Sequence, residues 1–220
     1  MIREQVTEFL QNLPEGVQLV GAAKTRTPQE ILEAIDGGLQ IIGENYVQEA
    51  EQAFQVIGRK VQWHMIGHLQ TNKVKKAVRV FDMIQTLGSL KLAEELQRCC
   101  ERLGTGMPVL VEINSGEESQ KSGVLPVDAI PLIKQVSELE RVKIKGLMTM
   151  GPFSPDPEDS RLPFRRTKEM FDTLREMNID RVEMKCLSMG MSSSFRVAIE
   201  EGANMVRIGT KLFGERKHNQ

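Results

Sequence analysis

A lysine follows an apolar stretch near the start of the chain. Residues 17–23 read Val-Gln-Leu-Val-Gly-Ala-Ala, and Lys24 comes directly after them. The stretch is typical of a buried strand, and a helix start with proline follows at Thr27-Pro28. An amine at the inner end of a buried strand must reach solvent, pair with another group or react. We therefore take Lys24 as the centre of a candidate site.

Two loops near the C-terminal end carry small and hydroxyl-bearing residues. The first contains Ser188-Met189-Gly190 and then Ser192, Ser193 and Ser194, and the second is Gly209-Thr210. Glycines let the backbone approach a ligand closely, and amides near helix starts bind phosphate. The serine run taken alone is more simply a helix cap. The two loops together favour a phosphate site.

The elements that position these residues repeat one order, a short apolar strand followed by a helix. We expect strands at about 17–23, 39–42, 61–66, 81–87, 107–114, 142–149, 182–187 and 205–208. A further amphipathic helix precedes them, over about residues 1–10. Parallel strands need helical crossovers, and eight such units predict one (β/α)8 TIM barrel, with residues 1–220 as a single domain. A doubly wound open sheet is the alternative, but residues 21–24 lack its glycine-rich first turn.

Composition and charge narrow the class of protein. The chain has 220 residues, of which 40% are hydrophobic and 27% charged, and its net charge is −1. These values are typical of a globular protein and argue against a broad nucleic-acid surface. We find no signal peptide and no apolar run near the ~18 residues of a membrane span. The three cysteines have no metal-ligand spacing, so we expect free thiols in a reducing cytoplasm.

In such a barrel the reacting groups lie at the C-terminal ends of the strands. Those ends carry Lys24, Asn45, His64, Gln85, Asn114, Thr149, Ser188 and Arg207. Simpler roles remain open for several of them. His64 is as readily a hydrogen-bonded core histidine, Asn114 is as readily the end of its strand, and Arg207 is a candidate partner of Glu200 or Glu201.

A reactive amine beside a phosphate site suggests two chemistries. One is a Schiff base with pyridoxal phosphate, and the other is a Schiff base with a phosphorylated sugar, as in the lysine aldolases. The residues alone leave both open.

Five segments of the chain resemble the pyridoxal-phosphate homeostasis protein family. They occur in the family's order over nearly the whole chain, and a cyanobacterial member is expected among the relatives. The segments are Gly-Ala-Ala-Lys-Thr at 21–25, Gly-Glu-Asn-Tyr-Val-Gln-Glu at 43–49, Trp-His-Met-Ile-Gly-His-Leu-Gln-Thr-Asn-Lys at 63–73, Leu-Ser-Met-Gly-Met-Ser at 187–192 and Val-Arg-Ile-Gly-Thr at 206–210. One departure is Ser193-Ser194, where many relatives have an acidic residue, and it bears on the helix cap more than on the phosphate site.

The resemblance implies a fold like the N-terminal domain of alanine racemase, without that enzyme's second domain. It implies that Lys24 forms the covalent aldimine with pyridoxal 5′-phosphate. It also implies Arg207 beside the pyridine nitrogen, Ser188, Gly209 and Thr210 around the phosphate, and Asn45 and Met189 along the ring pocket. Members of the family hold and buffer the cofactor and affect amino-acid and keto-acid balance, with no established catalysis.

The residues themselves also argue against catalysis. A racemase needs bases on both faces of the cofactor, and beyond Lys24 the candidates are His64 and the single tyrosine, Tyr46, which we expect inside a helix. An arginine at the ring nitrogen disfavours ring protonation and weakens the electron sink. We therefore expect a non-enzymatic cofactor carrier, with a weak amino-acid racemase as the alternative and an aldolase third. We expect a monomer, with apo-enzymes or a regulatory protein as partners.

Overall fold

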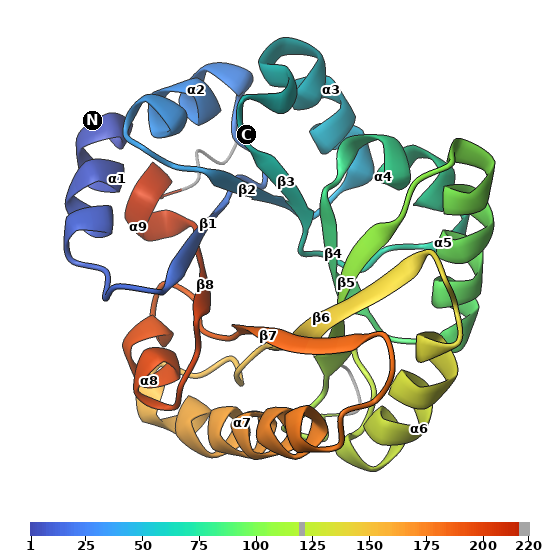
Figure 1. The fold of residues 1–220 in the computed structure, drawn as a ribbon. Helices are drawn as coiled ribbons and strands as arrows, with labels where there is room; N and C mark the ends of the chain where they lie inside the picture. Colours follow the sequence, from blue (N-terminus) through green and yellow to red (C-terminus); the bar gives the residue numbers. More distant parts are fainter. Residues whose placement is uncertain (119–121, 216–220) are drawn as a thin grey trace.

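The computed structural model describes residues 1–118 and 122–215, and its eight parallel strands close into a barrel (Figure 1). The strands are β1 (Gln18–Ala22), β2 (Ile41–Glu44), β3 (Gln62–Met65), β4 (Met83–Leu87), β5 (Met107–Ile113), β6 (Val142–Thr149), β7 (Val182–Ser188) and β8 (Met205–Ile208). They are hydrogen-bonded in sequence order, and β1 pairs with both β2 and β8. The predicted (β/α)8 barrel is confirmed.

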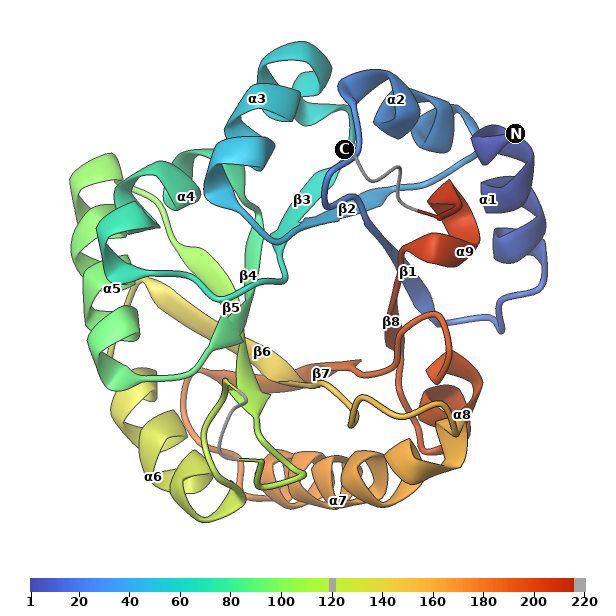
Figure 2. The ribbon, with the colours of Figure 1, turned by 180° about the vertical axis from the view of Figure 1, so that it is seen from behind.

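Helices surround the barrel (Figures 1 and 2). They are α1 (Ile2–Gln11), α2 (Pro28–Asp36), α3 (Val47–Ile57), α4 (Val74–Val80), α5 (Leu90–Leu103), α6 (Pro126–Ser137), α7 (Arg161–Glu176), α8 (Phe195–Glu200) and α9 (Thr210–Phe213), with short 3-10 turns at Gly58–Lys60, Thr71–Lys73 and Pro157–Ser160. The expected N-terminal helix is α1. The capping box at Thr27 is present, since its hydroxyl accepts from the Glu30 amide and Glu30 bonds back to the Thr27 amide.

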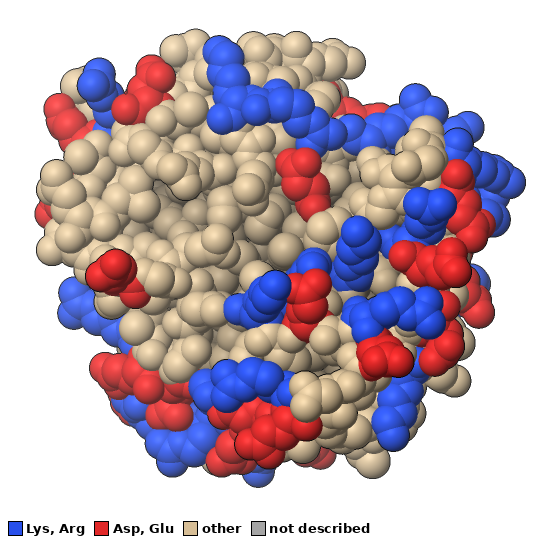
Figure 3. All heavy atoms as spheres, viewed as in Figure 1, with Lys and Arg blue, Asp and Glu red and all other residues tan. Residues whose placement is uncertain are grey.

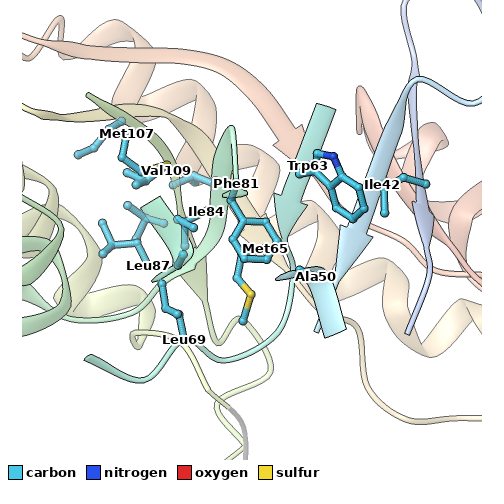
Figure 4. Close-up of a cluster of buried hydrophobic side chains, with 14 of the residues drawn as sticks. Ile42, Ala50, Trp63, Met65, Leu69, Phe81, Ile84, Leu87, Met107 and Val109 are labelled. Atoms are coloured by element: carbon cyan, nitrogen blue, oxygen red, sulfur yellow. The ribbon is translucent and has the colours of Figure 1, made fainter. Parts of the chain in front are cut away.

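The main hydrophobic core lies between the barrel and the helices. Figure 4 shows part of this layer around Trp63 and Met65. The Trp63 side chain is fully buried, and its indole nitrogen donates to the Gly58 carbonyl at 2.9 Å. A smaller cluster, which includes Val20 and Ile41, fills the barrel interior. Since side chains alternate along a strand, β1 directs Val20 and Ala22 inward, and Lys24 continues that inward series.

Most predicted strand bounds differ from the observed ones by one or two residues, and two boundaries have a clear local cause. The second strand begins at Ile41 and not at Leu39, because the Leu39 amide still bonds to the Ala34 carbonyl and ends α2. The helix α8 begins at Phe195, after the serine run at 192–194 that the sequence offered as its cap. There the Ser194 hydroxyl accepts from the Met191 amide and forms a turn instead of a helix cap. The short helix α9 was not predicted.

Charged side chains of both signs lie intermixed around the edge of the face drawn in Figure 3. No helix among the described residues combines the length and apolar character needed to cross a membrane. Cys99 and Cys100 are buried in α5, Cys186 lies half-buried in β7, and all three are free thiols. No three His, Cys, Asp or Glu side chains within 1–118 and 122–215 are grouped to hold a metal ion.

The pairing of β6 with β7 predicts a strict requirement for glycine. Gly146 has φ +149°, and a Cβ atom there would lie 1.8 Å from the Cys186 carbonyl oxygen. We expect Gly146→Ala to lower the free energy of unfolding by roughly 1–3 kcal/mol more than Gly104→Ala, measured by urea denaturation. Gly104 is the matched control, because it also has a positive φ but no atom lies within 4 Å of the place that an added Cβ would take. Equal losses for the two variants would contradict this steric explanation.

Candidate functional site

A cavity of about 440 Å³ opens at the C-terminal ends of the strands. Five of the residues predicted for the site line it together, namely Lys24, Asn45, Arg207, Gly209 and Thr210. Further lining residues were not assigned to the ring pocket or phosphate site from the sequence: Arg26, Ile66, Met150, Phe153, Met191 and Ser193. Ser192, which the sequence offered as a hydroxyl donor, also lines the cavity. The structure thus joins the lysine and the two C-terminal loops in one site.

Lys24 presents its amine to this cavity from the turn after β1. Its Nζ atom lies 5.1 Å from the centre of the Tyr46 ring, a cation–π contact. Within the described residues, no side chain or backbone group forms an ion pair or hydrogen bond with this amine. The next residue, Thr25, has φ +65°, and its amide donates to Glu49 Oε2 at 3.0 Å. This turn fixes the direction of the chain just after Lys24.

Tyr46 does not lie inside a helix, so that prediction was wrong. It precedes α3 with an extended backbone, φ −129° and ψ 128°, and its side chain is about half exposed. An extended residue at the helix start directs its side chain away from the helix axis. The ring lies beside Lys24.

Arg207 forms the inner end of the cavity. It is 3% exposed, and its Nη1 and Nη2 atoms donate to Ser188 Oγ at 2.6 Å and to the Thr149 carbonyl at 2.9 Å. Burial lowers the pKa of Arg207 to about 10, which still leaves the guanidinium charged at neutral pH. The suggested pairing with Glu200 or Glu201 is wrong.

Those two carboxylates form ion pairs elsewhere. Both contact Arg161 of α7, and Glu201 also contacts Arg165. They therefore belong to the outer helical layer, on the far side of the backbone from the barrel interior.

A chain of hydrogen bonds runs from Arg207 across the barrel interior. Ser188 Oγ accepts from Arg207 and donates to Gln85 Oε1 at 2.7 Å, and the Gln85 amide nitrogen lies 2.9 Å from His64 Nδ1. Burial lowers the pKa of His64 to about 4, so the imidazole is neutral and its Nδ1 accepts from Gln85. His64 is therefore a hydrogen-bonded core histidine, as the simpler interpretation held.

Ser188 and Met189 lie outside the lining of the cavity. The Ser188 hydroxyl is fully buried beneath Arg207, with both its donor and an acceptor position used. Met189 is fully buried in the layer between the barrel and the helices. Asn114 also points away from the site, because its side-chain amide bonds twice to the backbone of Glu118 and ends its strand, as the simpler interpretation held.

Hydroxyl and amide groups gather at the outer end of the cavity. The Gly209 amide donates to Ser192 Oγ at 3.3 Å, and the hydroxyls of Ser193 and Thr210 lie in exposed positions beside it. The Arg26 side chain is 8% exposed, and its guanidinium donates to the Gly214 carbonyl and to Glu30. Arg26 therefore links the turn after β1 to the end of α9, and it holds these two segments together at the outer end of the cavity.

Glu44 lies at the end of β2, under the loop that carries Asn45. Its carboxyl is 1% exposed, and Oε2 has no hydrogen-bond partner among the described residues. Burial, with Glu49 nearby, raises its pKa to about 8, so the group is largely protonated at neutral pH. Glu44 has the same strand parity as Ile42, which packs in the outer core, and it does not line the cavity.

The chain is similar to known sequences over nearly its whole length. The sequence model of the alanine racemase N-terminal domain family matches residues 2–217. A pyridoxal phosphate homeostasis protein of Aquifex aeolicus is 45% identical over 203 residues, which cover 91% of this chain and 88% of that protein. A protein of the same name from Pasteurella multocida is 32% identical over 232 residues, covering 100% and 99%.

Solved structures agree with the fold. PipY of Synechococcus elongatus is 33% identical, and its structures without and with pyridoxal phosphate (PLP) give TM-scores of 0.91 and 0.89 over 97% of this chain and 100% of PipY. An alanine racemase of Clostridium difficile is 18% identical with a TM-score of 0.83, covering 99% of this chain and 57% of that enzyme. The latter likeness shows a shared barrel.

The hydrogen-bond chain behind Arg207 generates a stability prediction. Ser188→Ala removes an acceptor from Arg207 and the donor to Gln85, so we expect the free energy of unfolding to fall by about 1–3 kcal/mol. Ser137→Ala is the control, because Ser137 is also buried but its hydroxyl bonds only to the Lys134 carbonyl of its own helix. Chemical denaturation of both variants is the measurement. A loss at position 188 no larger than at position 137 would contradict the importance of the chain.

Proposed function

The chain belongs to the family of pyridoxal phosphate homeostasis proteins, and from that premise we propose that it binds pyridoxal 5′-phosphate reversibly through Lys24 and holds it for other proteins. The observation that carries the proposal is the Lys24 amine, which faces a cavity with no ion-pair or hydrogen-bond partner among the described residues. The name and fold of the relatives support it, as does the PLP-bound structure of PipY.

The groups that line the cavity fit this cofactor. Its aldehyde requires an amine, which Lys24 supplies. Its phosphate requires hydrogen-bond donors, and the hydroxyls of Ser192, Ser193 and Thr210 lie together at the outer end, where the Gly209 amide donates to Ser192 Oγ. Ile66 and Met191 offer apolar surface along the wall between the two ends, beside Asn45. When bound, the cofactor supplies an electrophilic carbon and an electron-accepting ring.

We assign Arg207 to the ring nitrogen and give Ser188 an indirect role. Ser188 and the Thr149 carbonyl hold the guanidinium by two hydrogen bonds, so its charge stays at one place. A fixed cation at the ring nitrogen disfavours protonation of that nitrogen. Ser188 thus acts by orienting Arg207, and Met189 by packing behind the loop.

We further propose that the protein is not an enzyme. The neutral His64 is 2% exposed and bonded to Gln85, so it is not positioned to exchange protons with a ligand in the cavity. Tyr46, the single tyrosine, lies beside Lys24 and so does not supply a base on the opposite face. A weak amino-acid racemase remains the alternative function.

We propose that residues 1–220 act as one cofactor-binding unit and as a monomer in the cytoplasm. The expected partners are apo-enzymes that accept the cofactor, or a regulatory protein.

Covalent binding predicts a lysine-specific adduct. After incubation with PLP and removal of the free cofactor, the protein should keep visible absorbance, and borohydride reduction followed by peptide mass spectrometry should place the adduct on Lys24. Lys24→Ala should abolish both signals, and the control variants Lys73→Ala and Lys211→Ala should retain them. A colourless wild-type protein, or an adduct on Lys73 or Lys211, would contradict the assignment of Lys24 as the PLP-binding residue.

Absence of catalysis predicts slow exchange at the substrate α-carbon. We expect the PLP-loaded protein to exchange the α-proton of amino acids in deuterated water at well below ~1 per second, a rate at the slow end for enzymes. Proton NMR of several amino acids measures it, with Lys24→Ala as the background. Exchange at or above that rate, lost in Lys24→Ala, would favour the racemase.

A further inference from the structure

A second cavity, of about 370 Å³, opens over the ends of β3, β4 and β5. Its wall is made by the loop after β3, the start of α5 and residues 122–123. It shares no described lining residue with the cavity of Lys24. Part of it comes from the segment 63–73, which the sequence comparison singled out and which contributes only Ile66 to the Lys24 cavity.

A buried carboxyl forms the inner end of this cavity. Glu112 of β5 is 4% exposed, and none of the described residues donates a hydrogen bond to its side chain. Burial raises its pKa to about 7, an effect that the charge of Arg207 partly offsets. Since Glu112 lines the cavity, a ligand there that brings N–H groups would hydrogen-bond to its carboxyl.

The hydroxyl groups around the cavity have a fixed polarity. Thr86 is 3% exposed, and its hydroxyl donates to the Gly67 carbonyl at 2.7 Å, so only its lone pairs face a ligand. Ser89 is exposed and accepts from the Leu92 amide, which leaves its own proton free to be donated. The inner end therefore accepts hydrogen bonds, and the outer end donates them.

A positive charge reinforces the outer end. Lys91 is exposed at the rim, in the first turn of the 14-residue helix α5. Helix starts of this kind favour anions, because their amides lack acceptors within the helix. The rim thus prefers a negative group, while Glu112 at the inner end prefers a positive one.

Backbone hydrogen bonds hold the wall of the second cavity beside Glu112. The Val124 amide donates to the Glu112 carbonyl at 2.9 Å, and the Asn114 amide donates to the Val124 carbonyl at 2.8 Å. Gly123, with φ +100°, lies so close that a Cβ atom would be 3.0 Å from Glu112 Cγ. These contacts fix where the carboxyl lies before any ligand arrives.

We propose that this second cavity binds the zwitterion of a small α-amino acid. The ammonium group donates to Glu112 and Thr86, and the carboxylate accepts from Ser89 and pairs with Lys91. A metal ion is a poorer occupant, because no group of three His, Cys, Asp or Glu ligands exists in the described part of the chain. A simple anion leaves the carboxyl unsatisfied. The proposal does not depend on the PLP cofactor.

The test is binding of L-alanine to the full-length Lys24→Ala protein without PLP, by isothermal titration calorimetry. This background prevents any Schiff base with the cofactor. Glu112→Gln keeps the shape of the side chain and removes its charge, so we expect affinity to fall about tenfold or more. Lys91→Met should also weaken binding. The control variants Glu140→Gln and Lys75→Met, both at exposed positions, should leave it unchanged.

Two analogues separate the halves of the ligand. Ethylamine carries only the ammonium, and propionate only the carboxylate, so each should bind more weakly than L-alanine. Ethylamine should lose affinity in Glu112→Gln, and propionate in Lys91→Met. The proposal is overturned if L-alanine shows no saturable binding, if it binds Glu112→Gln as tightly as the parent, or if propionate alone matches it. None of these outcomes bears on the adduct at Lys24.

Discussion

A charged guanidinium buried in the barrel is the constraint on which the site depends. Burying a charge without partners is prohibitive, and Arg207 donates hydrogen bonds to Ser188 Oγ and to the Thr149 carbonyl, while the charge of Glu112 also favours its charged form. The Ser188 hydroxyl in turn donates a hydrogen bond to Gln85 Oε1, and the Gln85 amide donates to His64 Nδ1. Strands β3, β4, β7 and β8 each contribute one side chain to this chain. The polar interior therefore specifies a single arrangement of those strands, and this arrangement places the charge at the cavity's inner end.

The closed barrel explains why distant segments meet at Lys24. Pairing of β1 with β8 brings Val20 opposite Arg207, so the turn after β1 and the loop after β8 are neighbours. Pairing of β1 with β2 likewise brings Asn45, which follows β2, next to the turn after β1. Gly209 and Lys24 are far apart in sequence, yet they line one cavity. The position of the amine follows from strand register, and the turn at Thr25 adds only its direction.

The sequence was sufficient for the alternation of strands and helices, and for the residues that continue an inward series, such as Lys24 and Arg207. It was insufficient where a role depends on which of two neighbouring residues faces the barrel interior. Ser188 and Met189 are neighbours, so a strand must direct them to opposite sides, and only the structure shows Ser188 in the interior and Met189 in the outer layer. Tyr46 was misplaced because α3 begins one residue later, at Val47. Glu112 carried no signal, since it resembles any charged residue within a strand until its burial is known.

Arg207 and Glu112 also connect the two cavities. Each lines a different one, yet their charges interact across the barrel interior. A ligand ammonium at Glu112 favours the ionised carboxylate, and an ionised carboxylate stabilises the charge on Arg207. That charge is the one expected to lie at the ring nitrogen of the cofactor. Any change that an occupant of one cavity makes in the affinity of the other must be reciprocal, because binding free energies are linked. The buried pair thus gives a physical route by which an amino acid would alter how firmly this protein holds PLP.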